Sequence, residues 1–269
     1  MGQRSRRGRR FFLEVFSGEG YMTGAILEAG LRVGAPLDLK KGPHFDITDP
    51  RVQKVIIGWI RSGAIWLMHL ATPCTRWSIA RSSSTSEPVG GLAAARFTVR
   101  LIQECRRAGV HFTLENPQRS RIWSWRPLAR ALKSAGAILV DLCQCRFGTP
   151  FQKPTRFAAS HPLFATLGRQ CRCQRHCEVL SGKVFVKGRW EWKTSLAAAY
   201  PPGLCRAYAG VAQHLAPPAA ARPEAEAELE RRWERQLASA RGCDAAGVSP
   251  PRCPLRYRLP WHGCQRRWD

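Results

Sequence analysis

Acidic residues are scarce in this chain. Its 269 residues include 19 Asp and Glu against 43 Lys and Arg, which gives a formal net charge of +24. A positive field of this size attracts polyanions, and nucleic acid is the leading class of partner. The alternative is a generally basic proteome, or a basic tail with little order.

Long apolar runs are also missing. No segment approaches the roughly 20 consecutive apolar residues that a membrane-spanning helix needs, so we expect no membrane partner. The Arg-rich start lacks the apolar stretch of a signal peptide, so we expect none. The cysteine count is 11, and an odd number in a soluble basic chain favours reduced thiols, with a metal site as one use of them. We find no internal repeats.

Apolar runs and helical patterns alternate along most of the chain. The predicted strands are 11–16, 31–39, 64–70, 110–115 and 137–142, and the predicted helices are 21–29, 52–61, 92–108, 127–135 and 202–215. This alternation indicates an α/β fold with a mostly parallel, doubly wound, Rossmann-like sheet. A hairpin is predicted around Lys187-Gly188, where we expect Trp190 and Trp192 to pack against the domain, with base stacking as the alternative. A charged helix is predicted over 224–240.

A glycine-containing turn follows the first predicted strand. Phe16-Ser17-Gly18-Glu19-Gly20 runs from that strand into a predicted helix, and the two glycines let a ligand approach the backbone closely. The turn is not a P-loop, because no Gly-Lys-Ser/Thr follows it. An ordinary tight turn is the alternative.

Two acidic residues follow this turn. Asp38 falls near the end of the second predicted strand, where an acid typically holds ribose hydroxyls. Asp46 comes after a further loop. For both residues, the alternative is a helix N-cap or a surface carboxylate.

Cys74 stands directly after the predicted strand 64–70. Pro73 turns the backbone there and presents the thiol at a strand end, where α/β enzymes build their sites. Glu115 and Asn116 end the next predicted strand. A thiol and a carboxyl at two strand ends are a candidate nucleophile and acid, and a buried structural thiol is the alternative for Cys74.

These motifs occur in the order found in the DNA cytosine-5 methyltransferases, which the chain resembles from about residue 11 to residue 215. The matching residues are Phe16, Gly18, Gly20, Pro73, Cys74, Ser78, Glu115 and Asn116, with a distorted counterpart of a basic segment in Gln152 to Arg156. The chain departs from the family pattern at Thr75, Pro117 and Pro154. Its target-recognition region is also short, so it looks like a compact, divergent branch.

The resemblance implies S-adenosylmethionine as the cofactor and the methyltransferase form of the Rossmann-like fold. It assigns cofactor binding to Phe16, Ser17, Gly18, Gly20, Asp38, Asp46 and Pro73. It assigns catalysis to Cys74, Glu115, Asn116 and Arg156, and nucleic-acid contacts to Arg76, Ser78, Lys153 and Arg156. The thiol would add to C6 of an extruded cytosine, the Glu115 carboxyl would bind the base edge, and Asn116 would orient the loop. Arg76 and Arg156 would favour the thiolate.

The resemblance further implies DNA as the partner and a nuclear or nucleoid location. An RNA cytosine-5 methyltransferase and a degenerate nucleic-acid-binding protein of the same fold are the alternatives, and the sequence does not indicate the oligomeric state. The chain divides into a basic arm (1–10), a catalytic domain (11–157 and 194–216), a small irregular recognition insert (158–193) and a Pro/Ala/Arg-rich tail (217–269) with little expected order.

A Cys/His cluster lies in the recognition insert. Cys171, Cys173, His176 and Cys177 are four potential ligands within seven residues, and soft thiolates with an imidazole suit Zn²⁺. Cys143 and Cys145 lie upstream. Because the spacing is not that of a standard zinc finger, scattered thiols are the alternative.

Overall fold

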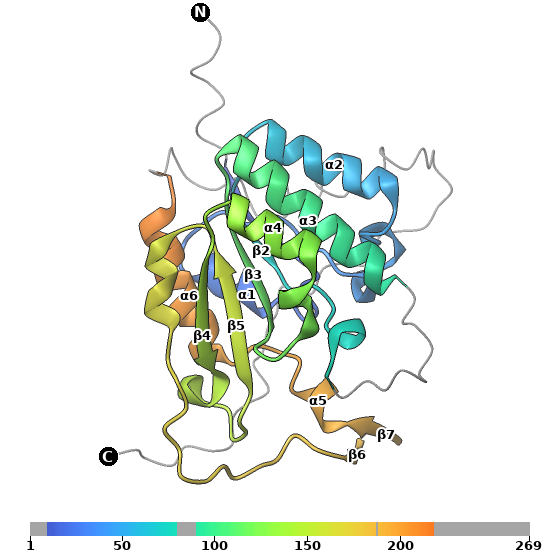
Figure 1. Cartoon of the computed structure of the whole chain (residues 1–269), viewed down its shortest axis with the longest axis vertical. Helices are drawn as coiled ribbons and strands as arrows, with labels where there is room; N and C mark the ends of the chain where they lie inside the picture. The colour runs from blue at the N-terminus through green and yellow to red at the C-terminus, as the bar shows by residue number, and fades with distance from the viewer. Residues whose placement is uncertain (1–9, 80–89, 187, 218–269) are drawn as a thin grey trace, which may run out of the picture.

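A mixed sheet forms the centre of the protein. The computed structural model describes residues 10–79, 90–186 and 188–217. In this part of the chain, five strands form one sheet in the order β1-β2-β3-β5-β4 (Figure 1). The strands are β1 (Phe11–Val15), β2 (Ile65–Leu70), β3 (His111–Pro117), β4 (Ile138–Cys143) and β5 (Pro154–Ala159). β1, β2 and β3 are parallel, and β5 runs antiparallel to both of its neighbours.

Helices cover both faces of the sheet. On one face lie α2 (Pro50–Arg61), α3 (Gly91–Ala108) and α4 (Arg126–Ser134), and on the other lie α1 (Tyr21–Glu28) and α6 (Pro202–Leu215) (Figure 1). The short helix α5 (Lys193–Leu196) precedes α6. The prediction of a Rossmann-like α/β fold is confirmed. No helix in the described ranges is both long and apolar enough to cross a bilayer.

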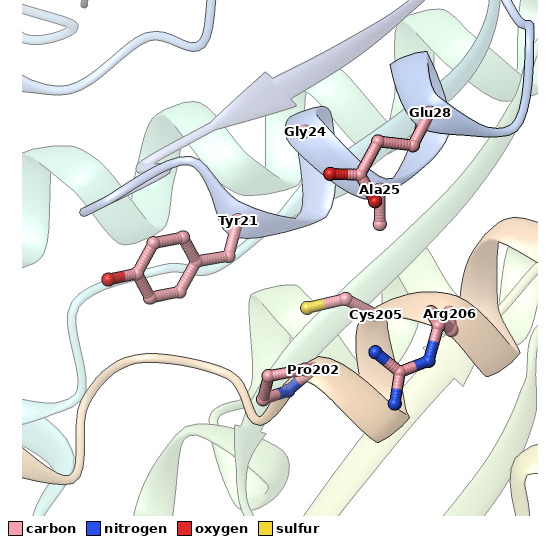
Figure 2. Close-up of a pocket in the computed structure, with 7 residues that line it drawn as sticks. All are labelled: Tyr21, Gly24, Ala25, Glu28, Pro202, Cys205 and Arg206. Carbon is pink, nitrogen blue, oxygen red and sulfur yellow. The ribbon is translucent and has the colours of Figure 1, made fainter. Parts of the chain in front are cut away.

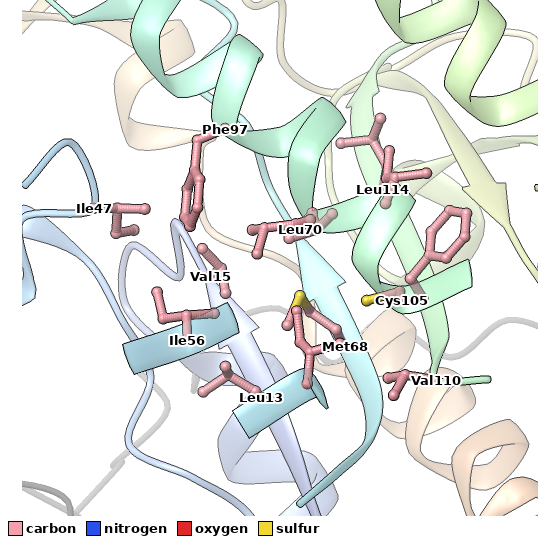
Figure 3. Close-up of a cluster of buried hydrophobic side chains, with 14 of the residues drawn as sticks. Leu13, Val15, Ile47, Ile56, Met68, Leu70, Phe97, Cys105, Val110 and Leu114 are labelled. Atoms are coloured by element: carbon pink, nitrogen blue, oxygen red, sulfur yellow. The ribbon is translucent and has the colours of Figure 1, made fainter. Parts of the chain in front are cut away.

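β1 and β2 are mostly apolar because both of their faces are buried. Every residue of β1 and β2 is buried, as expected for parallel strands covered by helices on two sides. Leu13 and Met68 point into the core under α2 and α3 (Figure 3), whereas Phe12 and Leu67 pack under α1 and α6. This alternation places two apolar layers around one sheet.

The register of the parallel strands aligns their carboxyl ends. Val15 pairs with Leu70, and Leu70 pairs with Leu114. The segments that follow these residues therefore begin side by side. They are the glycine turn after β1, the Pro73-Cys74 loop after β2, and Glu115-Asn116 at the end of β3.

Two strand predictions need correction. The predicted strand 31–39 forms only single bridges from Val33 and Leu37 to β1, because Pro36 has no amide hydrogen to donate and interrupts a regular ladder. In contrast, β5 was not predicted, and it continues to Ala159 across the domain boundary predicted at residue 158. The remaining divisions of the chain stay predictions. The basic arm up to residue 9, the helix over 224–240 and the tail from residue 218 lie outside the described residues.

The predicted hairpin is present, but its aromatic side chains do not pack as expected. β6 (Lys183–Val186) and β7 (Arg189–Trp192) form a two-stranded ribbon. Trp190 and Trp192 are 67% and 57% exposed, so the expectation that they pack against the domain is wrong. The Trp190 ring instead contacts that of Phe185, which is also exposed.

Removing a buried side chain from β1 should destabilise the fold far more than removing an exposed one from β4. Leu13 is fully buried and Leu139 is 55% exposed. We expect Leu13→Ala to lower the free energy of unfolding by about 2–5 kcal/mol, because it leaves a cavity in the core. Leu139→Ala should change it by less than about 0.5 kcal/mol. Urea unfolding measures both, and equal losses would contradict the assigned core.

Candidate active site

The turn after β1 is held in a left-handed conformation. Phe16, Gly18 and Gly20 have φ values of 61°, 54° and 77°. Glycine adopts this region without strain, whereas the Phe16 backbone is strained there. The Glu14 carboxylate binds the start of α1, the helix that follows the turn. Its Oε2 accepts hydrogen bonds from the Thr23 amide (2.8 Å) and hydroxyl (2.5 Å).

The structure shows both predicted acids capping backbone amides. Asp38 Oδ2 accepts from the Gly18 amide at 2.7 Å, and its Oδ1 accepts from Lys40 at 2.9 Å. Asp46 Oδ1 accepts from the amide and hydroxyl of Thr48, at 2.9 and 2.7 Å. Asp38 is thus coupled directly to the glycine turn, whereas Asp46 closes a local turn. Their roles in binding a cofactor stay predictions.

A buried hydrogen bond fixes the loop that carries Cys74. Asn116 Nδ2 donates to the Thr72 carbonyl at 2.7 Å, and the Thr72 hydroxyl lies 2.7 Å from that of Thr98 on α3. Both Asn116 and Thr72 are buried. The end of β3 therefore holds the backbone two residues before Cys74, which fits the expected loop-orienting role of Asn116.

Cys74 and Glu115 lie close enough to influence each other electrostatically, and Lys153 joins them. Burial raises the pKa of the Glu115 carboxyl, and the positive charge of Lys153 opposes that shift. Desolvation by surrounding protein raises the pKa of the Cys74 thiol, although the residue itself is exposed. The negative charge of Glu115 raises this thiol pKa further, and Lys153 lowers it.

The structure adds a source of positive charge beside the thiol that was not expected there. The charge of Lys153 lowers the pKa of the Cys74 thiol, and the expectation that Arg76 and Arg156 favour the thiolate stays a prediction. The Lys153 Nζ donates to the Ala197 carbonyl at 2.7 Å, which orients the ammonium group. Lys153 immediately precedes β5, so the unpredicted strand is what brings it to the ends of β2 and β3.

Arg156 is bound to an acid on β4. Its Nε and Nη2 donate to the two Asp141 oxygens at 2.6 and 2.7 Å. Gln118 Nε2 also donates to Asp141, at 2.9 Å. The Arg156 side chain thus links β5 to β4. Its assigned contacts with substrate stay predictions.

Arg76 and Ser78 lie just after Cys74. Arg76 belongs to the short 3-10 helix Thr75–Trp77, and its guanidinium lies 5.3 Å from the Trp77 ring centroid. Ser78 follows that helix in extended conformation. Their expected nucleic-acid contacts stay predictions.

A chain of buried hydrogen bonds ends on Glu115. Tyr200 Oη donates to Glu115 Oε2 at 3.0 Å and lies 3.0 Å from His69 Nε2. His69 Nδ1 is 2.8 Å from the Thr113 hydroxyl, which is 2.7 Å from the Tyr208 hydroxyl. Burial lowers the pKa of His69 to about 3, so its ring is neutral at physiological pH.

Because the His69 ring is neutral, the donor and the acceptor of each hydrogen bond in this network are determined. Because Tyr200 donates to the Glu115 carboxylate, its oxygen accepts from His69 Nε2–H. Nδ1 then accepts from Thr113, and Tyr208 donates to Thr113. The Glu115 carboxylate is therefore oriented by groups from β2, β3 and α6. Sequence analysis missed His69, Thr113 and Tyr200 in this role. A polar residue inside each of two apolar strands is the signal that marks His69 and Thr113.

The predicted metal ligands are only partly brought together. Donor atoms of Cys145, Cys171, Cys173 and His176 all lie within 4.8 Å of one another. Cys177 was predicted as a ligand but lies outside this group, and Cys145 from the β4–β5 connection takes its place. Spacing along the sequence favoured Cys177, which directly follows His176, whereas folding brings Cys145 to the cluster.

The groove between α1 and α6 is separate from Cys74 and Glu115. It is lined by Tyr21, Gly24, Ala25, Glu28, Pro202, Cys205 and Arg206 (Figure 2). Its volume is about 30 Å³, room for a few water molecules at roughly 10–15 Å³ each.

The comparisons with known proteins show weak similarity to methyltransferase structures. No family model and no curated protein matches the chain. Similar solved structures are the S. pombe Dnmt2 methyltransferase (14% identity, 56% of this chain, 50% of that chain, TM-score 0.37) and a Spodoptera frugiperda DNMT2 mutant (16%, 63%, 54%, 0.40). A third is the Entamoeba histolytica methyltransferase EhMeth (13%, 63%, 57%, 0.33). The chain therefore spans 50 to 57% of the length of these structures, and likeness at this level assigns no function.

The charges beside Cys74 should control its reactivity in opposite directions. In the wild type, the pH midpoint for alkylation of Cys74 should lie above the ordinary thiol value of about 8.5. Glu115→Gln removes a negative charge and should lower the midpoint, whereas Lys153→Met removes a positive charge and should raise it. Peptide mass spectrometry after iodoacetamide pulses resolves Cys74 from the other cysteines. Unchanged midpoints in both variants would show that the three groups are not close.

Proposed function

We propose that this protein transfers a methyl group from S-adenosylmethionine to C5 of cytosine in nucleic acid, with DNA as the expected substrate. The observation that carries the proposal is the grouping of Cys74, Glu115 and Lys153 at the strand ends, beside the left-handed turn at Gly18. A nucleophile, an acid and a cation at one edge of a Rossmann-like sheet match what cytosine activation requires.

The glycine turn has the features of a cofactor site. The Ser17 hydroxyl is buried and has no hydrogen-bond partner among the described residues. At Gly18, no atom lies within 4 Å of the position that a Cβ would occupy, so the backbone is open to a ligand. The residues that would hold the cofactor are Phe16, Ser17, Gly18, Gly20, Asp38, Asp46 and Pro73. When bound, S-adenosylmethionine supplies an electrophilic methyl group on a sulfonium.

The residues of the site have complementary tasks in this reaction. Cys74 adds as a thiolate to C6 of cytosine, and the electron pair of the C5–C6 double bond makes C5 nucleophilic. Lys153 favours the thiolate, because its charge lowers the thiol pKa. Glu115 binds the N3/N4 edge, and its raised pKa helps it to hold a proton at N3. After methyl transfer, C5 loses its proton to solvent, the bond from C6 to the Cys74 sulfur breaks, and the thiolate leaves, which restores the C5–C6 double bond.

The surface of the protein suits a nucleic-acid substrate. The net charge is +24, and the β6–β7 ribbon exposes Phe185, Trp190 and Trp192, with the Lys183 ammonium 4.9 Å from the Trp192 ring centroid. Exposed aromatic rings beside cations stack on unpaired bases. Extruding a base from a duplex requires a few kcal/mol, and such contacts offset that requirement. We propose a nuclear or nucleoid location on the same grounds.

RNA is the second candidate substrate, because the same exposed rings suit single-stranded bases. A non-catalytic protein of this fold is the remaining alternative. It would bind nucleic acid tightly, with strong salt dependence and without taking up the cofactor.

Loss of the thiol should abolish the covalent reaction. The protein is incubated with radiolabelled cofactor and with duplex DNA or structured RNA, each in a cytosine form and in a 5-fluorocytosine form that traps the adduct. We expect labelled product and a trapped complex with the wild type, and neither with Cys74→Ser. Cys177→Ser, which changes another exposed cysteine, should behave as wild type. Equal turnover in Cys74→Ser would refute the proposal, and the substrate that traps distinguishes DNA from RNA.

Removal of the Asp38 carboxylate should weaken cofactor binding. Asp38→Ala deletes the acceptor of the Gly18 amide, and a hydrogen bond to a charged group contributes about 1.5–3 kcal/mol. We therefore expect the dissociation constant for S-adenosylmethionine to rise roughly tenfold or more in calorimetry. The exposed Glu178→Gln serves as the control. Unaltered affinity in Asp38→Ala would remove this residue from the cofactor site.

A further inference from the structure

The segment from residue 168 to residue 182 has no core of its own. It contains no helix and no strand ladder, and none of its residues is buried. Apart from contacts between cysteine sulfurs, three of the hydrogen bonds found link it to the β4–β5 region. The Cys143 amide donates to the Arg169 carbonyl (2.8 Å), the Gln170 side chain to the Asp141 carbonyl (3.0 Å), and the Glu178 amide to the Pro150 carbonyl (3.1 Å). Since exposed hydrogen bonds contribute little, a chain segment of this kind needs another source of stability.

Four ligand atoms meet where this segment contacts the β4–β5 connection. Cys145 lies in the 3-10 helix Gln144–Phe147, and Cys171, Cys173 and His176 lie in the segment itself. The Cys171 sulfur is 3.4 Å from His176 Nε2, and the Cys173 sulfur is 3.9 Å from that of Cys145.

These separations fit a single tetrahedral ion. With Zn–S near 2.3 Å and Zn–N near 2.0 Å, two thiolates on one zinc lie about 3.8 Å apart, and a thiolate and an imidazole about 3.5 Å apart. The two observed distances agree with these values. Three sulfurs and one nitrogen in tetrahedral arrangement are typical of a closed, structural zinc site.

We propose that Cys145, Cys171, Cys173 and His176 bind one Zn²⁺ ion, which ties the recognition insert to the β4–β5 connection. On binding, each of the three thiols releases its proton to solvent, the imidazole binds in its neutral form, and the ion loses its water ligands. The ion is a structural tie and takes no part in methyl transfer, so this proposal stands independently of the proposed function.

The surrounding charge favours this ligand set. Three thiolates and a neutral imidazole give the zinc complex a net charge of −1. Arg146, Arg172 and Arg175 are adjacent to ligands in the sequence and are exposed, so they supply positive charge around an anionic site.

Two nearby cysteines lie outside the proposed ligand set. Cys177 lies outside the cluster, although it directly follows His176 in the sequence. Cys143 is buried, and its sulfur lies 3.2 Å from that of Cys145. A ligand set chosen by sequence spacing alone contains Cys177 and omits Cys145. Variants of these two residues therefore distinguish the site formed by folding from a site formed by neighbouring residues only.

Metal analysis of paired variants tests the proposal. The full chain is purified in reducing buffer without chelator, and its zinc is measured by inductively coupled plasma mass spectrometry. We expect about one zinc per chain in the wild type and in Cys177→Ser. Cys145→Ser and Cys173→Ser should lose most of it. Zinc retained in Cys145→Ser but lost in Cys177→Ser would overturn the assigned site.

Two further measurements use only the wild-type protein, so misfolding of a variant does not confuse them. Replacement of zinc by Co²⁺ should give the visible bands of a tetrahedral ion and a near-ultraviolet sulfur-to-metal band. Removal of the metal with a chelator should speed tryptic cleavage at Arg172 and Arg175 severalfold, because both lie between or beside ligands. Reduced protein that contains no zinc and gives no tetrahedral cobalt spectrum would overturn the proposal.

Discussion

The parallel register of β1, β2 and β3 is the constraint on which the candidate site depends. It places Val15, Leu70 and Leu114 in one row, so that a glycine turn, a thiol and a carboxyl follow at the same edge of the sheet. If one strand were shifted by one residue against its neighbour, its side chains would point to the opposite face of the sheet. The apolar residues of the strands therefore determine where the chemistry lies, although none of them takes part in it.

Buried polar contacts fix the positions of the groups that the strand register brings to this edge of the sheet. Asn116 holds the loop before Cys74, and the neutral His69 connects Tyr208 and Thr113 to Tyr200 and Glu115. Buried polar groups are stabilising only when they are paired, so this network favours a single arrangement of its members. The segment from residue 168 to residue 182 contains no buried residue, and the proposed zinc ion would stabilise it.

The sequence predicted the long helices and the parallel strands because their apolar patterns are strong. It predicted Cys74, Glu115 and Asn116 as a group because each stands at a strand end. It did not predict β5, whose residues after Pro154 include the charged Arg156 among small and apolar ones. The resemblance assigned Lys153 to nucleic-acid contact, and without β5 nothing in the sequence placed it beside the thiol. His69 was missed, and Cys145 was noted but not included among the ligands, because their partners come from distant parts of the chain and no local pattern records such contacts.

The central claim is that Cys74 and Glu115 act on one cytosine. A crystal structure of the protein with an oligonucleotide trapped through 5-fluorocytosine, in the presence of the demethylated cofactor, tests it most directly. We predict a bond from the Cys74 sulfur to C6 of an extruded base, with the Glu115 carboxyl at its N3/N4 edge and the cofactor against the turn at Gly18. A base bound elsewhere, or a bond to another cysteine, would contradict the account.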